Sequence, residues 1–144
     1  MNFENKNFNR INVAALIVDE NSRFLICKRS KNKKFLPGIW HFPGGKVEKG
    51  ESNIQALQRE LIEEINIKNI SEFIDLKISH EYIVKEEKHK TEFYFCKTTD
   101  TPNINNEENE ALKFILPVEV KDYINDRSTT ILINAVQKVL NENQ

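Results

Sequence analysis

The sequence predicts a mixed fold of the α/β or α+β class, in which a β-sheet lies between helices. Residues 11–18 and 24–27 are apolar and rich in β-formers, which is typical of buried strands. Residues 53–65 and 129–140 instead carry their apolar side chains at helical spacing. Periodicity does not decide between the two classes, because it gives no strand pairing.

The first two strand segments are expected to form a hairpin. The polar residues 19–22, Asp-Glu-Asn-Ser, stand between residues 11–18 and 24–27 and have turn composition. A strongly basic run, residues 28–34, follows the second strand. The helix at residues 53–65 comes next, after a glycine-containing loop.

Two further strands and a last strand follow this helix. Residues 72–84 alternate loosely in a strand-like way and residues 91–96 are aromatic and β-rich, so a charged turn at 85–90 is expected to join them. Residues 98–109 are polar and predict an exposed loop, and residues 112–116 can form a final strand.

Length and composition favour a single enzyme domain over residues 1–144. The chain is 39% hydrophobic and 30% charged, which is ordinary for a globular domain of this size, and no repeat or long linker divides it. A net charge of −1 gives no electrostatic reason to expect nucleic acid or an anionic membrane as a partner.

Cys27 and Cys96 lie in apolar segments without metal-binding or redox spacing, so buried reduced thiols are expected. The first residues lack an apolar signal-like region, and no stretch approaches the length of a membrane span. These features favour a cytoplasmic protein.

Three carboxylates are predicted to share one face of the helix at residues 53–65. Glu60, Glu63 and Glu64 stand at positions i, i+3 and i+4, within an arc of about 100°. Like charges at this spacing oppose each other by about 0.2–0.5 kcal/mol per pair, and the helix dipole disfavours anions near the C-terminus. The cluster therefore costs stability unless a cation binds it.

Mg²⁺ suits these acids, because it prefers hard oxygen ligands and no His or Cys accompanies them. The alternative is a solvated acidic face on which Arg59 pairs with Glu63. Residues 42–46, Phe-Pro-Gly-Gly-Lys, precede the helix and let the backbone approach a ligand closely, with Lys46 available to anionic oxygens. A Ser52 and Gln55 capping box is expected to start the helix.

These residues resemble the Nudix box of the Nudix hydrolases. The matching pattern is Gly45, five residues, Glu51, seven residues, and then Arg59-Glu60-Leu61-Ile62-Glu63-Glu64-Ile65-Asn66-Ile67. Asn66 stands where the family has Gly, and Asn tolerates the left-handed conformation that closes a helix, so the turn is expected to be preserved. The resemblance implies the α/β/α sandwich of that family, with a mixed β-sheet between helices.

The resemblance also implies Mg²⁺-dependent hydrolysis, with Mn²⁺ as a substitute, of a nucleoside diphosphate linked to a further moiety. The metal ligands it implies are Gly45, Glu60, Glu63 and Glu64. Arg59 is assigned to orienting the carboxylates. These carboxylates and Arg59 form the expected catalytic set.

A further metal-directed carboxylate often comes from a loop beyond the box in this family. Counting back from Phe114, Glu108 is the best candidate, with Glu107 and Glu110 close behind, although an acidic loop can simply be solvated. The general base stays open between a helix glutamate and a loop glutamate.

Residues 39–48 resemble the corresponding segment of mutator-type (MutT-like) nucleoside triphosphate pyrophosphohydrolases, where a Glu is common in place of His41. Trp40 is a candidate to stack on a base, but a place in the core is favoured. Arg29, with the lysine before it, and Lys46 are candidates to bind phosphates. Asn125 and the aspartate after it lie near the base-contacting positions of the family.

Three functions compete. The first is pyrophosphohydrolysis of a nucleoside triphosphate, either an oxidised guanine nucleotide or a pyrimidine nucleotide, to the monophosphate and pyrophosphate. The second keeps the chemistry but acts on an ADP-ribose-like compound, a dinucleoside polyphosphate or capped RNA. The third is a non-catalytic nucleotide-binding module, which the complete set of acids disfavours. A small-molecule nucleotide is the expected partner, and a monomer or a homodimer is the expected assembly.

Overall fold

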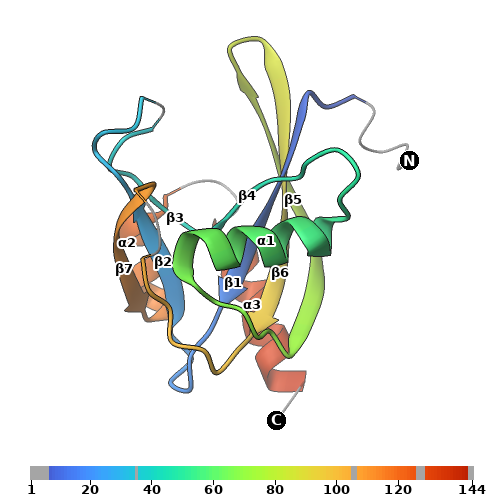
Figure 1. Cartoon of the computed structure of the whole chain (residues 1–144). Coiled ribbons are helices and arrows are strands. Elements are labelled where there is room, and N and C mark those ends of the chain that lie inside the picture. Colours follow the sequence, from blue (N-terminus) through green and yellow to red (C-terminus); the bar gives the residue numbers. More distant parts are fainter. Residues whose placement is uncertain (1–6, 35, 105–106, 126–128, 143–144) are drawn as a thin grey trace.

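Two β-sheets lie between helices in the computed structural model, which describes residues 7–34, 36–104, 107–125 and 129–142 (Figure 1). The four-stranded sheet has the order β4 (Gly44–Lys46), β1 (Arg10–Ile17), β6 (Glu87–Lys97) and β5 (Glu72–Val84). The three-stranded sheet has the order β3 (Trp40–His41), β2 (Phe24–Arg29) and β7 (Asn109–Ile115). The helices are α1 (Asn53–Ile65), α2 (Val120–Tyr123) and α3 (Thr129–Glu142), and a 3-10 turn, η2 (Pro117–Glu119), precedes α2.

The four-stranded sheet is mixed. Strands β1 and β6 run parallel along eight paired positions, whereas β4 joins β1 and β5 joins β6 in antiparallel fashion. The long β5–β6 hairpin projects beyond the body of the molecule at the top of Figure 1. The pairing of β4 with β1 places the glycine residues of β4 next to α1.

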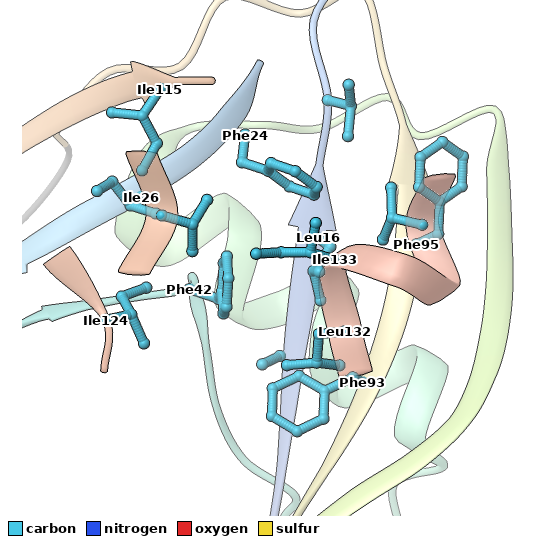
Figure 2. Packing of buried hydrophobic residues seen from close by; sticks show 14 residues of the cluster. Leu16, Phe24, Ile26, Phe42, Phe93, Phe95, Ile115, Ile124, Leu132 and Ile133 are labelled. Atoms are coloured by element: carbon cyan, nitrogen blue, oxygen red, sulfur yellow. The ribbon is translucent and has the colours of Figure 1, made fainter. Parts of the chain in front are cut away.

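Both faces of β1 are buried, because its alternate side chains enter two different apolar clusters. Val13 and Ala15 pack in the cluster that contains the apolar side of α1, while Ala14 and Leu16 pack in the cluster that contains α3. Figure 2 shows the second cluster, in which Leu16 lies among aromatic side chains and residues of α3. The α/β/α sandwich implied by the family resemblance is confirmed.

Helix α1 has the boundaries that the sequence predicts. The Ser52 hydroxyl accepts a hydrogen bond from the Gln55 amide at 3.1 Å, and the Gln55 side chain accepts one from the Ser52 amide at 2.9 Å. Asn66 closes the helix in the left-handed conformation, with φ 58° and ψ 31°, and its amide donates to the Ile62 carbonyl. The exchange of the family glycine for Asn therefore preserves this turn.

The predicted hairpin between the first two strands is wrong. β1 and β2 belong to different sheets, and their ends meet through an antiparallel bridge between Val18 and Phe24 and a hydrogen bond from the Asp19 amide to the Arg23 carbonyl at 3.0 Å. One edge of β1 is paired with β6 along its whole length, and β4 pairs with the other edge at residues 12–14. The turn residues between the strands therefore redirect the chain from one sheet to the other.

Three predicted boundaries also need correction. The turn between β5 and β6 contains only Lys85 and Glu86, both with positive φ, as a two-residue hairpin turn requires. Its expected remainder belongs to β6, where Lys90 is buried and pairs with Glu92 at 3.2 Å. Strand β7 begins at Asn109, inside the predicted polar loop, because that residue pairs with β2. Helix α3 extends to Glu142, past its expected end.

The two cysteines are free and buried, as expected. None of the helices in the described part of the chain has both the length and the apolar character that crossing a membrane requires.

We predict that the stability of the C-terminal end of α1 depends on how easily residue 66 adopts the left-handed conformation. Replacing Asn66 with Ala should lower the free energy of unfolding by about 1 kcal/mol, because a Cβ-bearing residue without a short polar side chain is strained at positive φ. Asn66→Gly should keep or raise stability, since glycine adopts this conformation freely. Urea unfolding of the three proteins measures the difference. Equal stability of the Ala and Gly variants would contradict the role given to the left-handed turn.

Candidate functional site

A pocket of about 460 Å³ lies between the glycine loop, the acidic face of α1 and the start of β7. Its acidic side is formed by the carboxylates of Glu48, Glu60, Glu63, Glu64 and Glu108. Its basic residues are Arg10, Arg29, Lys46 and Arg59. We call this the Glu60 pocket. It brings together residues that are up to about a hundred positions apart in the sequence.

Most of the predicted site residues line this pocket. They are Arg29, Gly45, Lys46, Arg59, Glu60, Glu63, Glu64 and Glu108. Trp40 and Asn125 are not among its described lining residues. Trp40 instead packs edge to face on Tyr123, with ring centroids 5.4 Å apart, which agrees with the core alternative, and Asn125 is exposed. The candidate at position 126 lies outside the described residues.

Glu64 is the most deeply buried of the pocket carboxylates, with 5% of its surface exposed. The backbone amide of Gly44 donates a hydrogen bond to its Oε2 atom at 3.2 Å. Burial, followed by the nearby charge of Glu60, raises the pKa of Glu64 to about 8, and Glu108 adds to the effect through charge and a hydrogen bond. The carboxyl is therefore held in an environment that resists ionisation.

Glu60 lies directly against the glycine loop. A Cβ atom placed on Gly45 would lie 2.4 Å from the Glu60 carboxyl carbon, so any larger residue there would force this carboxylate to move. Burial raises the pKa of Glu60, while its hydrogen bond from Arg59 lowers it. The loop backbone and the helix carboxylate thus share one side of the pocket.

Arg59 holds the loop and the helix together. Its guanidinium donates to both carboxylate oxygens of Glu51, at 2.8 and 2.9 Å, and to the Lys46 carbonyl oxygen at 2.8 Å. It also donates to Glu60 at 2.8 Å, and its contact with Glu63 is longer, at 3.4 Å. The hydrogen bonds from Arg59 lower the pKa of Glu51 to about 2. These contacts fit the orienting role expected for Arg59.

Glu108 reaches the helix carboxylates from the residue that precedes β7. Its side chain hydrogen bonds with Glu64, and its charge contributes to the raised pKa of both Glu60 and Glu64. Lys33 approaches it at 3.9 Å. Of the two alternatives, Glu107 is exposed and Glu110 pairs with Lys28 at 3.6 Å, and neither lines the pocket.

The donor set suits a divalent cation that prefers hard oxygen ligands. Glu60 and Glu108 lie close enough to Glu64 to raise its pKa, and Glu108 also raises the pKa of Glu60, so a cation bound among these carboxylates would relieve both their repulsion and the cost of their burial. Within the described residues, however, no three acidic, His or Cys side chains are already arranged as a ligand cluster.

The sequence analysis missed two residues that line the pocket, Arg10 and His41, and it also missed the contact that Asn109 makes with His41. Arg10 lines it from β1 and donates to Asn12 at 2.7 Å, and the only sequence signal was the alternation of polar and apolar residues at the start of this strand. Asn109 was assigned to a loop, but it lies 2.9 Å from His41 across β2. No local pattern could indicate that second contact.

A comparison with models of known protein families shows to which family this chain belongs. A model of the NUDIX domain matches residues 8–132, which include the whole glycine loop and α1. The chain belongs to the Nudix family. The resemblance to its MutT-like branch is also confirmed by the relatives described next.

Two curated Nudix relatives match about half of their own length. The 8-oxo-dGTP diphosphatase of Buchnera aphidicola is 46% identical over 68 residues, which cover 44% of this chain and 50% of that protein. The CTP pyrophosphohydrolase of Escherichia coli is 40% identical over 65 residues, which cover 44% of this chain and 47% of that protein. Among solved structures, the Escherichia coli ORF135 protein has a TM-score of 0.68 at 29% identity, and the match covers 90% of this chain and 89% of that one.

The raised pKa of Glu64 predicts a pH-dependent stability of the metal-free protein. Between its ordinary pKa of 4.5 and about 8, folded Glu64 holds a proton that the unfolded chain has released. Stability from this group is therefore greatest below about pH 4.5, falls as the pH rises from there to about 8, and levels off at higher pH. Glu64→Gln should flatten this decline, as measured by thermal unfolding at several pH values.

Glu81→Gln, on the exposed hairpin strand β5, is the matched control and should keep the wild-type slope. Parallel pH profiles of the wild type and Glu64→Gln would show that Glu64 is not the titrating group.

Proposed function

We propose that this Nudix protein is a divalent-metal-dependent nucleoside triphosphate pyrophosphohydrolase, which releases a nucleoside monophosphate and pyrophosphate. The observation that carries the proposal is the Glu60 pocket, where the Nudix-box carboxylates and Glu108 face the cations of Arg10, Arg29 and Lys46. The names of the two curated relatives support a nucleoside triphosphate as the substrate class. The choice of base stays open between an oxidised guanine and a pyrimidine.

Glu60, Glu63, Glu64 and Glu108 would hold the metal, with the backbone of Gly45 beside them. When bound, Mg²⁺ or Mn²⁺ supplies charge neutralisation of the phosphates and activation of water. The raised pKa of Glu64 means that this residue must lose a proton before it can act as a ligand, so the affinity for metal should rise with pH.

The basic side of the pocket would bind the phosphates. Arg10, Arg29 and Lys46 come from β1, β2 and β4, so they surround the carboxylates from different strands. Arg59 is already engaged with Glu51 and Glu60, and its role is to keep the loop and helix in register. Water attack in this arrangement is assisted by a general base that is either a helix glutamate or Glu108.

The position of bond cleavage tests the reaction. A panel of nucleoside triphosphates should give the monophosphate and pyrophosphate, and in ¹⁸O-labelled water the label should enter the monophosphate if attack occurs at the α phosphorus. Label in the pyrophosphate would instead indicate attack at the β phosphorus. Release of inorganic phosphate with a nucleoside diphosphate would contradict the proposal. Turnover of ADP-ribose or a dinucleoside polyphosphate, with every triphosphate inert, would favour the second function.

The carboxylates should be needed for turnover rather than for folding. Glu63→Gln and Glu64→Gln should each lower kcat by about 100-fold or more, the scale on which lost stabilisation of developing charge acts. Circular dichroism should be unchanged, since Gln has the same shape as Glu. The Glu81→Gln control should retain wild-type activity. Near-full activity of both pocket variants at limiting Mg²⁺ would contradict the metal assignment.

A further inference from the structure

A side-chain hydrogen bond crosses the three-stranded sheet at the Glu60 pocket, and one of its partners, His41, also lines that pocket. His41 in β3 is paired with Cys27 of β2, and Asn109 in β7 is paired with Arg29 of β2. The two side chains meet over β2, with His41 Nε2 and Asn109 Oδ1 2.9 Å apart. The other ring nitrogen, Nδ1, lies 2.9 Å from the Phe42 carbonyl oxygen. His41 is thus fixed at both ring nitrogens.

Asn109 is an unusual residue at the start of a strand, because only 4% of its surface is exposed. Its Nδ2 atom has no hydrogen-bond partner among the described residues. When Nδ1–H of a neutral His41 donates to the Phe42 carbonyl, Nε2 is an acceptor, and the Asn109 amide can turn over so that Nδ2–H donates to it. This rotation of the side-chain amide gives the buried Asn109 nitrogen a hydrogen-bond partner and keeps the contact across β2.

The residue before Asn109 is Glu108, the carboxylate that reaches the helix from outside the Nudix box. Its backbone carbonyl accepts a hydrogen bond from the Ser30 amide at 2.8 Å, just beyond an irregularity in the β2–β7 pairing at Lys28 and Arg29. Regular strand pairing therefore weakens where Glu108 must be held in place. Its side chain also lies beside Glu64, and the two carboxyl groups repel when both are ionised.

We propose that His41 and Asn109 form a positioning pair that holds the start of β7 against β3, and so keeps Glu108 beside Glu64. The pair acts through the backbone of Glu108. The functional consequence rests on the proposed function, in which Glu108 is a metal-directed carboxylate. The positioning itself does not depend on metal, so the two can be tested separately.

The first experiment uses the metal-free full chain and measures amide hydrogen exchange at Ser30 by NMR. His41→Ala and Asn109→Ala should each speed exchange at Ser30 by about 10-fold or more, because the hydrogen bond to the Glu108 carbonyl opens more often. His41→Gln, whose side-chain amide can still bond with Asn109, should restore slow exchange. Ile115→Val is the matched control, because it weakens packing at the opposite end of β7 without touching the pair.

Exchange at Ser30 that is no faster in the two Ala variants than in Ile115→Val would overturn the proposal. His41 is half-buried, so His41→Ala is expected to fold. If Asn109→Ala does not fold because Asn109 is buried, exchange at Ser30 in His41→Ala decides the outcome.

The second experiment measures Mn²⁺ binding to the nucleotide-free chain by electron paramagnetic resonance. His41→Ala and Asn109→Ala should weaken binding by about 10-fold or more, the range typical of groups that orient metal ligands. In a Glu108→Gln background the same substitutions should cause no further loss, since their effect passes through Glu108. His41→Gln should bind as the wild type does.

An undiminished effect of His41→Ala in the Glu108→Gln background would overturn the proposal, because His41 would then act by direct contact with the ligand. Absence of Mn²⁺ binding by the wild type would instead contradict the proposed function, while exchange at Ser30 would still decide whether the pair holds β7.

Discussion

Arg59 fixes the geometry on which the pocket depends. Its guanidinium bonds at once to the Glu51 carboxylate, the Lys46 carbonyl and Glu60, so it joins the loop before α1 to the acidic face of that helix. A guanidinium presents its donors in one rigid plane, which a flexible lysine cannot reproduce. The glycine loop is consequently held close to Glu60, and a side chain at Gly45 would displace the carboxylate from its present position.

The buried carboxylates of the pocket destabilise the folded state, so other contacts of α1 must offset them. Glu60 and Glu64 have raised pKa values because they are buried beside other acids, so ionising them disfavours the folded state. The opposite side of the same helix provides compensation, since Leu57, Leu61 and Ile65 are fully buried against the sheets. Buried apolar side chains of this size each contribute about 1.5–3 kcal/mol, which is enough to support a locally unfavourable cluster.

The parts that the sequence predicted well are those that depend on neighbours along the chain. The capping box at Ser52, the left-handed Asn66 and the shared face of the three glutamates all follow from short-range geometry. The approach of Glu108 was foreseen only through the family resemblance. The pairing of β1 with β6 was not foreseen, because the order of strands in a sheet is set by packing between distant segments. The contact of His41 with Asn109 depends on the order β3-β2-β7 of the three-stranded sheet and was missed for the same reason.

The two kinds of charge in the Glu60 pocket have a thermodynamic consequence for the proposed function. A polyphosphate alone would meet the repulsion of the carboxylates, and a divalent cation alone would meet the repulsion of Arg10, Arg29 and Lys46. When both are present, the basic residues would attract the phosphates and the carboxylates would attract the cation, so each ligand would remove a repulsion that the other experiences. Binding of metal and nucleotide should therefore be coupled, and linkage requires that each raises the affinity for the other by the same factor. Because burial and the charge of Glu60 raise the pKa of Glu64, metal binding would also release a proton from this carboxyl, and the coupling should therefore depend on pH.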